Sequence, residues 1–558
     1  MSAPTSPQSI MQNCNIGAAL HKAAAERKDA VALVTGKKGT YQQWTFQEVL
    51  ANSNRYANAL QAKGVQRGDR VMLMVRPSME FICLTYALFQ LGAVVILIDP
   101  GMGYKNLLRC IGSVQPKVLI AISQVHFFSR LFRKPFVTVE RRFCVGLNPL
   151  GVCGISMQGA ARKESPEFMA VNTEKDELAA IIFTTGSTGP PKGVQYTHGI
   201  FYHQLQQIRD YYGIGPDDVD QPGFPLFALF ATALGAAAVI PDMDPTRPAE
   251  VDPAKFIRSI QDKQVSYSFG SPAIWNVVSR YCIDQHITLP VRKVLMAGAP
   301  VPGELIERMQ QIMPEDGEVY TPYGATESLP STSITGREIL EETWTQTRIG
   351  KGTCVGRPLP GMRVEIIKPV DNPLADWNEV EVLSNGIIGE IVVKGPVVTQ
   401  AYDHNEEETR MAKIPDAEGG GLWHRMGDMG YQDEQGRLWF CGRKAHRVLT
   451  EQGPMYTICC EAIFNEHHEV FRSALVGLGE PGKQQPALTV ELYAKKPKDE
   501  KRLCVELEQL ARSNPLTSSI ETFMIFSVFP VDIRHNAKIF REKLAVWVQQ
   551  RLECRQGL

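Results

Sequence analysis

Apolar and polar residues follow two successive patterns along this chain. From about residue 30 to residue 340, short apolar runs that are typical of buried strands alternate with amphipathic stretches of helical period. The strand-like runs lie at 70–75, 94–98, 118–122, 181–183, 265–269 and 294–297. Alternation of this kind predicts layered α/β structure with largely parallel sheets.

The pattern changes beyond residue 356. Up to residue 439, short apolar runs are separated by turns, at 362–367, 389–394 and 438–441. This spacing predicts a small, mostly antiparallel, β-rich subdomain. After Gly442-Arg443-Lys444, short strand-like runs are mixed with helical stretches, which suits a compact α+β domain.

We therefore predict an α/β protein with two domains. Residues 1–442 form a large N-terminal domain of layered α/β subdomains with the small β-rich subdomain. Residues 443–558 form a small α+β C-terminal domain.

Two apolar stretches approach the length of a membrane span. Residues 81–98 are uncharged, but Gly92 divides them and the part after it is β-branched. A buried helix, a turn and a strand explain this stretch better than a span does. Residues 225–241 are shorter and bounded by prolines. The sequence therefore predicts no membrane span.

Composition narrows the class of protein. At 558 residues, 44% of them hydrophobic, the chain is long enough for two or three domains with full cores. A net charge of −1 argues against a nucleic acid partner. The 12 cysteines show neither Cys-x-x-Cys spacing nor a zinc pattern, and no secretory signal is evident. These features predict thiols rather than disulfides, in a cytoplasmic protein.

The segment 184–194 reads Thr-Thr-Gly-Ser-Thr-Gly-Pro-Pro-Lys-Gly-Val and follows an apolar, strand-like run. Glycines let backbone N–H groups approach an oxyanion closely, while hydroxyl groups and Lys192 add donors. A flexible linker can have this composition, but the preceding strand argues against one. A Walker P-loop needs Ser or Thr after its lysine, whereas Gly193 and Val194 stand here. We predict a phosphate-binding loop that is not that of a kinase or GTPase.

Further short strings follow in order along the chain. They are Gly64-Val65-x-x-Gly68-Asp69, Gly92-Ala93, Gly298-Ala299-Pro300, Tyr323-Gly324-Ala325-Thr326-Glu327, Val355-Gly356-Arg357-Pro358, Met426-Gly427-Asp428, Gly442-Arg443 and Arg534-His535-Asn536-Ala537-Lys538-Ile539-Phe540-Arg541. Any one of them is consistent with an ordinary turn, and Lys538 with a surface lysine at the start of a helix. In this order and spacing they resemble the adenylate-forming enzymes (the ANL superfamily), which include acyl-CoA synthetases, luciferases and peptide-synthetase adenylation domains. The resemblance covers nearly the whole chain.

The resemblance implies an ATP and acyl pocket in the N-terminal domain and a mobile C-terminal domain that carries a catalytic lysine. The residues that it assigns to ATP are Thr184, Thr185, Gly186, Ser187, Thr188, Gly189 and Lys192 in the phosphate loop, Gly298, Ala299 and Pro300 at the adenine edge, Tyr323 and Gly324 beside the adenine, Thr326 at the α-phosphate or acyl-phosphate oxygen, and Asp428 and Arg443 at the ribose. Glu327 and Thr184 would hold Mg²⁺, a hard cation that prefers oxygen ligands. Lys538 would neutralise charge at the α-phosphate, a task suited to a compact ammonium on a flexible stem.

Two departures from the family bear on the second half-reaction. CoA ligases of the family often carry histidine after a Pro-Leu-Phe string, where this chain has Ala228. The family hinge usually has Asp or Lys as the fourth residue from the glycine of the Gly-Arg pair, where this chain has Ala445. Both positions serve the rotation that brings a thiol to the adenylate, although alanine is also a neutral replacement.

As a whole, the chain is similar to the β-lactone synthetases of bacterial long-chain olefin biosynthesis. The shared features include Asp99-Pro100-Gly101-Met102-Gly103 and the ending at 534–541. The resemblance implies a long-chain 2-alkyl-3-hydroxy fatty acid substrate, whose 3-hydroxyl group attacks its own adenylated carbonyl, and assembly with a lactone decarboxylase and a short-chain dehydrogenase. A large apolar pocket is expected, with candidate walls at 224–230, 231–238 and 269–275. The alternatives are a long-chain fatty acyl-CoA ligase, a fatty acyl-AMP ligase, and a non-catalytic lipid or nucleotide binder.

Overall fold

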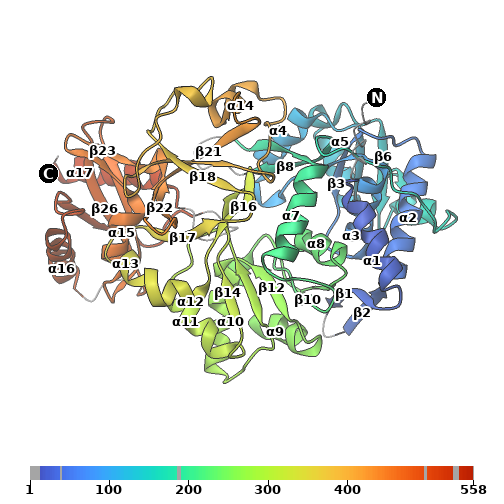
Figure 1. Ribbon diagram of the computed structural model, residues 1–558, viewed down its shortest axis with the longest axis horizontal. Coiled ribbons are helices and arrows are strands. Elements are labelled where there is room, and N and C mark those ends of the chain that lie inside the picture. Colours follow the sequence, from blue (N-terminus) through green and yellow to red (C-terminus); the bar gives the residue numbers. More distant parts are fainter. Residues whose placement is uncertain (1–12, 38–39, 185–189, 495–498, 532–538, 557–558) are drawn as a thin grey trace, which may run out of the picture. The chain divides into compact units, whose positions relative to one another are not determined.

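The structure is a computed structural model that describes residues 13–37, 40–184, 190–494, 499–531 and 539–556. The chain falls into two compact units (Figure 1). The first, unit 1, comprises Met1–Thr184, Pro191–Ile240 and Thr399–Asn405, and the second, unit 2, comprises Thr185–Pro190, Pro241–Val398 and Glu406–Leu558. The predicted division at residues 442 and 443 stays a prediction.

A seven-stranded sheet in the order β7-β6-β5-β3-β4-β8-β9 forms the framework of unit 1. Its strands are β3 (Arg70–Met74), β4 (Val94–Leu97), β5 (Val118–Ile122), β6 (Arg141–Val145), β7 (Ile155–Ser156), β8 (Leu178–Thr184) and β9 (Lys192–Thr197). All neighbouring pairs are parallel except β8 and β9. The predicted parallel layer is therefore confirmed, and its apolar runs are central strands that are buried on both faces.

Helices and a second group of strands complete unit 1. The helices are α1 (Ile16–Glu26), α2 (Phe46–Ala62), α3 (Met79–Leu91), α4 (Tyr104–Val114), α5 (Ser123–Leu131), α6 (Met157–Ala161), α7 (His198–Asp210) and α8 (Ala228–Ala233). Strands β10 (Val219–Asp220), β11 (Ala237–Ile240), β1 (Val31–Lys37) and β2 (Thr40–Thr45) are neighbours in that order. The segment at 399–405 belongs to unit 1 because the buried carboxylate of Asp403 accepts hydrogen bonds from Arg70 at 2.8 Å and from Gln195 at 3.0 Å.

The apolar stretch at 81–98 forms a helix, a turn and a strand, as predicted. Helix α3 ends at Gly92, whose φ of +68° is a left-handed conformation that favours glycine, and β4 follows. Among the described residues, no helix is both long and apolar enough to span a membrane. All twelve cysteines lie in the described part of the chain, and no disulfide bond joins any two of them.

Unit 2 begins with alternating strands and helices. These are α9 (Pro253–Asp262), β12 (Tyr267–Gly270), α10 (Pro272–Asp284), β13 (Lys293–Met296), α11 (Gly303–Ile312) and β14 (Glu318–Tyr320). The three strands are parallel.

A mostly antiparallel sheet follows in unit 2, in the order β15-β16-β17-β22-β21-β19-β18, with β20 paired to β21. Its strands are β15 (Tyr323–Ala325), β16 (Ser328–Ser333), β17 (Thr353–Pro358), β18 (Arg363–Ile367), β19 (Gly389–Lys394), β20 (Lys413–Pro415), β21 (Leu422–Gln432) and β22 (Leu438–Arg443). Short helices lie between them: α12 (Gly336–Glu338), α13 (Trp344–Arg348) and α14 (Glu406–Ala412). The predicted antiparallel subdomain is confirmed.

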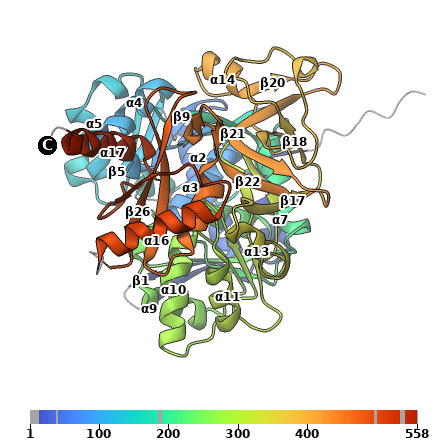
Figure 2. The same ribbon diagram turned by 90° about the vertical axis from the view of Figure 1, so that its left-hand side faces the viewer.

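The last part of unit 2 is an α+β layer structure. It contains β23 (Val448–Thr450), β24 (Gly453–Met455), α15 (Thr457–Asn465), β25 (Val470–Leu478), β26 (Gln485–Leu492), α16 (Glu500–Ser513), β27 (Thr522–Ile525) and α17 (Arg541–Gln556). Leu475 and Leu488 face α15 and α16, whereas Ala474 and Val476 face α17, as the alternation of a strand requires. In Figure 2, β26 lies between α16 and α17. Helices therefore cover both faces of the β25-β26-β27 sheet.

Candidate active site

Tyr323 begins a tight hairpin in unit 2. Strands β15 and β16 pair with Tyr323 opposite Thr332 and Ala325 opposite Ser328, so that Thr326 and Glu327 form the turn between them. Gly324 permits the close approach, because a Cβ atom there would lie 2.3 Å from the carbonyl oxygen of Ser328. The hairpin thus explains the glycine and places Thr326 and Glu327 at its tip, each of them half-buried.

Asp428 connects three of the predicted strings. Antiparallel pairing of β21 and β22 places Asp428 opposite Arg443, and Arg443 Nη1 lies 2.9 Å from Asp428 Oδ1. The hydroxyl group of Tyr323 donates a hydrogen bond to Asp428 Oδ2 at 2.7 Å. Asp428 is only 4% exposed. Tyr323 and Asp428, which are 105 positions apart in the sequence, therefore form one polar cluster with Arg443.

Burial and the charge of Asp428 shift the pKa values of its two partners. Burial, followed by the nearby carboxylate of Asp428, raises the pKa of Tyr323 well above its ordinary value. The same carboxylate raises the pKa of Arg443, against the opposing effect of burial. Tyr323 is thus a neutral donor and Arg443 a cation at neutral pH.

Lys413 is a residue of this region that the sequence analysis missed. It begins β20, and it is 5% exposed. Burial lowers the pKa of Lys413 to about 7, while the negative charge of Glu327 opposes the shift. Lys413 is therefore a second titratable group that interacts electrostatically with Glu327, the predicted metal ligand. The sequence signal for Lys413 was weak, because Lys413 and the following Ile414 lie outside every string that resembles the family.

The predicted phosphate loop falls partly outside the described residues, which exclude Thr185, Gly186, Ser187, Thr188 and Gly189. Thr184 is the last residue of β8, and it pairs directly with Lys192, the first residue of β9. Lys192 therefore belongs to a strand rather than to the loop, and its ammonium lies 5.1 Å from the centre of the Tyr402 ring.

Gly298, Ala299 and Pro300 follow β13 in a turn, as predicted. Gly298 has a φ of +98°, a conformation that favours glycine, so backbone geometry explains this residue without a ligand.

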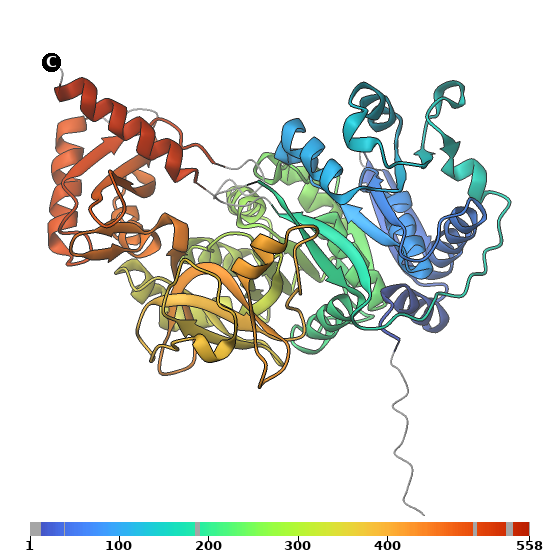
Figure 3. The ribbon, with the colours of Figure 1, turned by 90° about the horizontal axis from the view of Figure 1, so that it is seen from above.

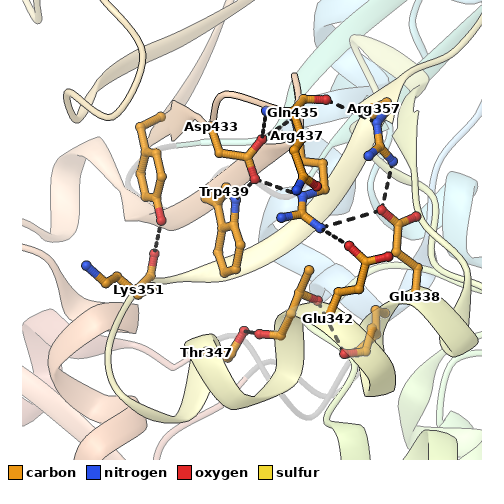
Figure 4. Close-up of polar contacts among 12 residues, drawn as sticks. Glu338, Glu342, Thr347, Lys351, Arg357, Asp433, Gln435, Arg437 and Trp439 are labelled. Carbon is orange, nitrogen blue, oxygen red and sulfur yellow. Dashed lines mark hydrogen bonds and ion pairs between the residues drawn. The ribbon is translucent and has the colours of Figure 1, made fainter.

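An ionic network anchors the β21–β22 turn (Figure 4). The Arg437 guanidinium, 10% exposed, lies 2.8 Å from Asp433 and 2.8 Å from Glu342. Arg357 connects the turn to α12, since it binds Glu338 at 2.7 Å and the Gln435 carbonyl oxygen at 3.2 Å. These contacts fix the hairpin whose two strands carry Asp428 and Arg443.

The predicted hinge is also held by charge. Lys444 Nζ lies 3.1 Å from Glu390 and 3.3 Å from Asp371, and it donates to the Val370 carbonyl oxygen. Glu390 is buried and also binds Arg425 at 2.7 Å. Ala445 follows directly in a short 3₁₀ turn, Lys444–His446. Lys444 is a contact of the hinge that the family strings did not indicate.

Lys538 lies outside the described residues, but the residues on both sides of 532–538 are described. Val531 and Ile539 form an isolated antiparallel bridge. Arg541 forms a buried ion pair with Glu461 of α15, with Nη2 and Oε2 2.9 Å apart. The return of the chain after the segment is thereby anchored on α15.

Ala228, one of the two departures from the family, and the histidine His198 lie in buried regions of unit 1. Ala228 begins α8 and is fully buried, as are the residues after it up to Ala233. His198 begins α7 with no exposed surface, and burial lowers its pKa to about 4. A neutral, buried His198 is a structural residue.

Known proteins that are similar to this chain identify its family. Residues 20–403 match the AMP-binding enzyme family. The chain is 43% identical over 557 residues to the olefin β-lactone synthetase of Xanthomonas campestris pv. campestris, across 96% of this chain and 98% of that protein. The chain belongs to the AMP-binding enzyme family. The olefin β-lactone synthetase of Stenotrophomonas maltophilia is likewise 43% identical to this chain, across 97% of this chain and 99% of that protein.

Solved structures share the fold of this chain. An anthranilate CoA ligase in complex with anthranoyl-AMP matches with a TM-score of 0.79 and 18% identity, across 99% of this chain and 100% of that chain. ATP-bound MatB from Rhodopseudomonas palustris matches with a TM-score of 0.76 and 22% identity, across 96% of this chain and 100% of that chain. The predicted adenylate-forming fold and the resemblance to β-lactone synthetases are confirmed, whereas the roles of the individual site residues stay predictions.

Proposed function

We propose that this protein is an ATP-dependent β-lactone synthetase that acts on a long-chain 2-alkyl-3-hydroxy fatty acid. The observation that carries the proposal is the 43% identity to two olefin β-lactone synthetases over nearly the full length of each. The contact of Tyr323, Asp428 and Arg443 supports the nucleotide site that the first half-reaction needs.

In the first half-reaction, a carboxylate oxygen of the substrate attacks the α-phosphorus of ATP. The bond from that phosphorus to the bridging oxygen breaks, and pyrophosphate leaves with the electron pair. Asp428 accepts hydrogen bonds from the ribose hydroxyl groups, since one carboxylate offers about four acceptor positions. Tyr323 and Arg443 hold its orientation. Lys538 stabilises the negative charge that develops at the α-phosphate.

The chemistry of two side chains fits Mg²⁺. Glu327 offers a carboxylate at the tip of a hairpin and Thr184 a hydroxyl group at the end of β8, and oxygen ligands of this kind are what Mg²⁺ prefers beside phosphate and water. When bound, Mg²⁺ neutralises part of the phosphate charge.

In the second half-reaction, the 3-hydroxyl oxygen attacks the acyl carbon of the adenylate. The bond between that carbon and the AMP oxygen breaks, the hydroxyl proton is lost to a base, and a four-membered lactone forms. Because the nucleophile belongs to the same molecule as the carbonyl group, proximity replaces a second binding site. Ala228 and Ala445, where CoA ligases of the family often carry other residues, agree with a reaction that needs no thiol.

One assay tests this function. ATP, Mg²⁺ and a long-chain 2-alkyl-3-hydroxy acid are supplied without CoA, and β-lactone and AMP are measured by mass spectrometry. The matched control is the same acid without the 3-hydroxyl group, from which we expect pyrophosphate exchange but no lactone. Turnover that appears only when CoA is added would instead identify an acyl-CoA ligase, and release of the adenylate without lactone an acyl-AMP ligase. No pyrophosphate exchange would identify a non-catalytic binder.

The lactone is the natural substrate of a decarboxylating enzyme, and the 3-hydroxy acid the natural product of a ketoreductase. We therefore infer assembly with a lactone decarboxylase and a short-chain dehydrogenase, which co-purification of the three proteins tests. A cytoplasmic location stays a prediction.

A further inference from the structure

The loop between β6 and β7 presents two leucines to solvent. Leu147 is 85% exposed and Leu150 is 99% exposed. Leu150 also has a φ of +51°, which is rare for a residue with a branched apolar side chain. This loop therefore keeps two large apolar side chains outside the core.

Hydrogen bonds fix the loop in this form. Asn148 Nδ2 donates to the Gly154 carbonyl oxygen at 2.8 Å, and Asn148 Oδ1 accepts from the Cys153 N–H at 3.0 Å. Ser123, at the start of α5, donates to the Leu147 carbonyl oxygen at 2.7 Å. Because these hydrogen bonds fix the backbone of the loop, the side chains of the two leucines stay exposed.

Helix α5 continues the apolar surface. Arg130 of α5 donates to the carbonyl oxygen of Val152, so that the helix and the loop lie side by side (Figure 3). Ser123, Phe127 and Arg130 are spaced four and three residues apart and therefore share one face of α5. Phe127 is 49% exposed and Leu131 is 76% exposed. We call Phe127, Leu131, Leu147 and Leu150 together the α5 surface.

The segment that carries the α5 surface is strongly basic. Between residues 101 and 163 the sequence has one acidic residue, Glu140, although the whole chain has 59 Lys and Arg against 60 Asp and Glu. The basic residues of this segment are Lys105, Arg109, Lys117, Arg130, Arg133, Lys134, Arg141, Arg142, Arg162 and Lys163. Of these, Lys105, Arg109, Arg130, Arg133, Lys134, Arg162 and Lys163 are exposed. Positive charge is thus concentrated where apolar side chains are exposed.

We propose that the α5 surface and its flanking cations are a docking site for an anionic phospholipid bilayer, on which the protein rests without spanning it. Exposed leucine and phenylalanine side chains enter the boundary between headgroups and acyl chains, while Lys and Arg meet the lipid phosphates. A bilayer surface satisfies both the cations and the four exposed apolar side chains. The inference does not depend on the reaction that the protein catalyses.

Vesicle co-sedimentation of the full-length protein tests the docking site. We expect binding to vesicles of phosphatidylglycerol mixed with phosphatidylcholine to exceed binding to pure phosphatidylcholine by about tenfold and to weaken with salt. The double variant Leu147→Ser, Leu150→Ser should lose at least about tenfold of that binding, because burial of the apolar side chains provides the anchor. The double variant Arg133→Gln, Lys134→Gln should lose the preference for phosphatidylglycerol.

The matched control is Val505→Ser, Val546→Ser, which removes two exposed apolar side chains (50% and 58% exposed) from α16 and α17. It should bind vesicles like the unaltered protein, and all variants should keep their unfolding temperature. Absence of binding to phosphatidylglycerol vesicles overturns the proposal, as does unchanged binding of the leucine variant. Self-association that the leucine variant abolishes, without vesicle binding, would instead make the α5 surface an interface between copies of this chain.

Discussion

At the scale of single residues, the hydrogen bond from Tyr323 to Asp428 orients a nearly buried carboxylate. Hydrogen bonds to charged groups contribute about 1.5–3 kcal/mol, and about 1.4 kcal/mol corresponds to a tenfold change in affinity. Tyr323→Phe should therefore raise the KM for ATP about tenfold with little change in kcat, measured by pyrophosphate exchange. Tyr431→Phe is the control, since its hydroxyl group bonds the Lys351 carbonyl oxygen at 3.0 Å on the same sheet. An unchanged KM in Tyr323→Phe would refute the role of Asp428 at the ribose.

His198 gives a prediction about pH. Its pKa is lowered to about 4 by burial, below the ordinary value of about 6.5. The unfolded state therefore binds the proton more readily, so stability is fully present above pH ~6.5 and falls by about 3 kcal/mol as the pH drops to ~4. His198→Phe should flatten this part of the unfolding profile, followed by urea titration at several pH values. His203→Phe, on the same helix, should keep it; an unaltered slope in His198→Phe would contradict the assignment.

At the scale of elements, Arg437 secures the β21–β22 turn. Its guanidinium is mostly buried among Asp433, Glu342 and Glu338. Arg437→Met would leave Asp433 and Glu342 without their cation, and breaking a buried pair typically costs about 3–5 kcal/mol. We expect a loss of that size in the free energy of unfolding, measured by urea titration with tryptophan fluorescence.

The matched control for Arg437 is an exposed pair. Arg209 lies 2.7 Å from Asp210, with both side chains more than half exposed, so Arg209→Met should cost less than about 1 kcal/mol. Equal losses in the two variants would mean that burial does not set the strength of the Arg437 network.

Elements whose hydrophobic period is strong were predictable from sequence. The run at 118–122 coincides with β5 and the run at 389–394 with β19, because central strands must be apolar whatever their neighbours. Residues of recurring strings, such as Tyr323 and Asp428, were also predictable. Their mutual contact was not, since it depends on the pairing of distant strands. Lys413 and Lys444 were missed because burial and ion pairing of a lysine arise from tertiary contacts that no local pattern encodes.

At the scale of the whole molecule, the family resemblance predicts that Lys538 completes a site whose other predicted residues lie between Thr184 and Arg443. Lys538→Ala should lower the rate of pyrophosphate exchange about 10²–10³-fold, the usual cost of removing one group that stabilises developing charge. Arg541→Met should lower it less, about tenfold, because Arg541 acts only through its ion pair with Glu461 of α15. Lys543→Ala, an exposed lysine of α17, should change nothing. Full exchange in Lys538→Ala, equal to that of Lys543→Ala, would refute the role of Lys538 in adenylation.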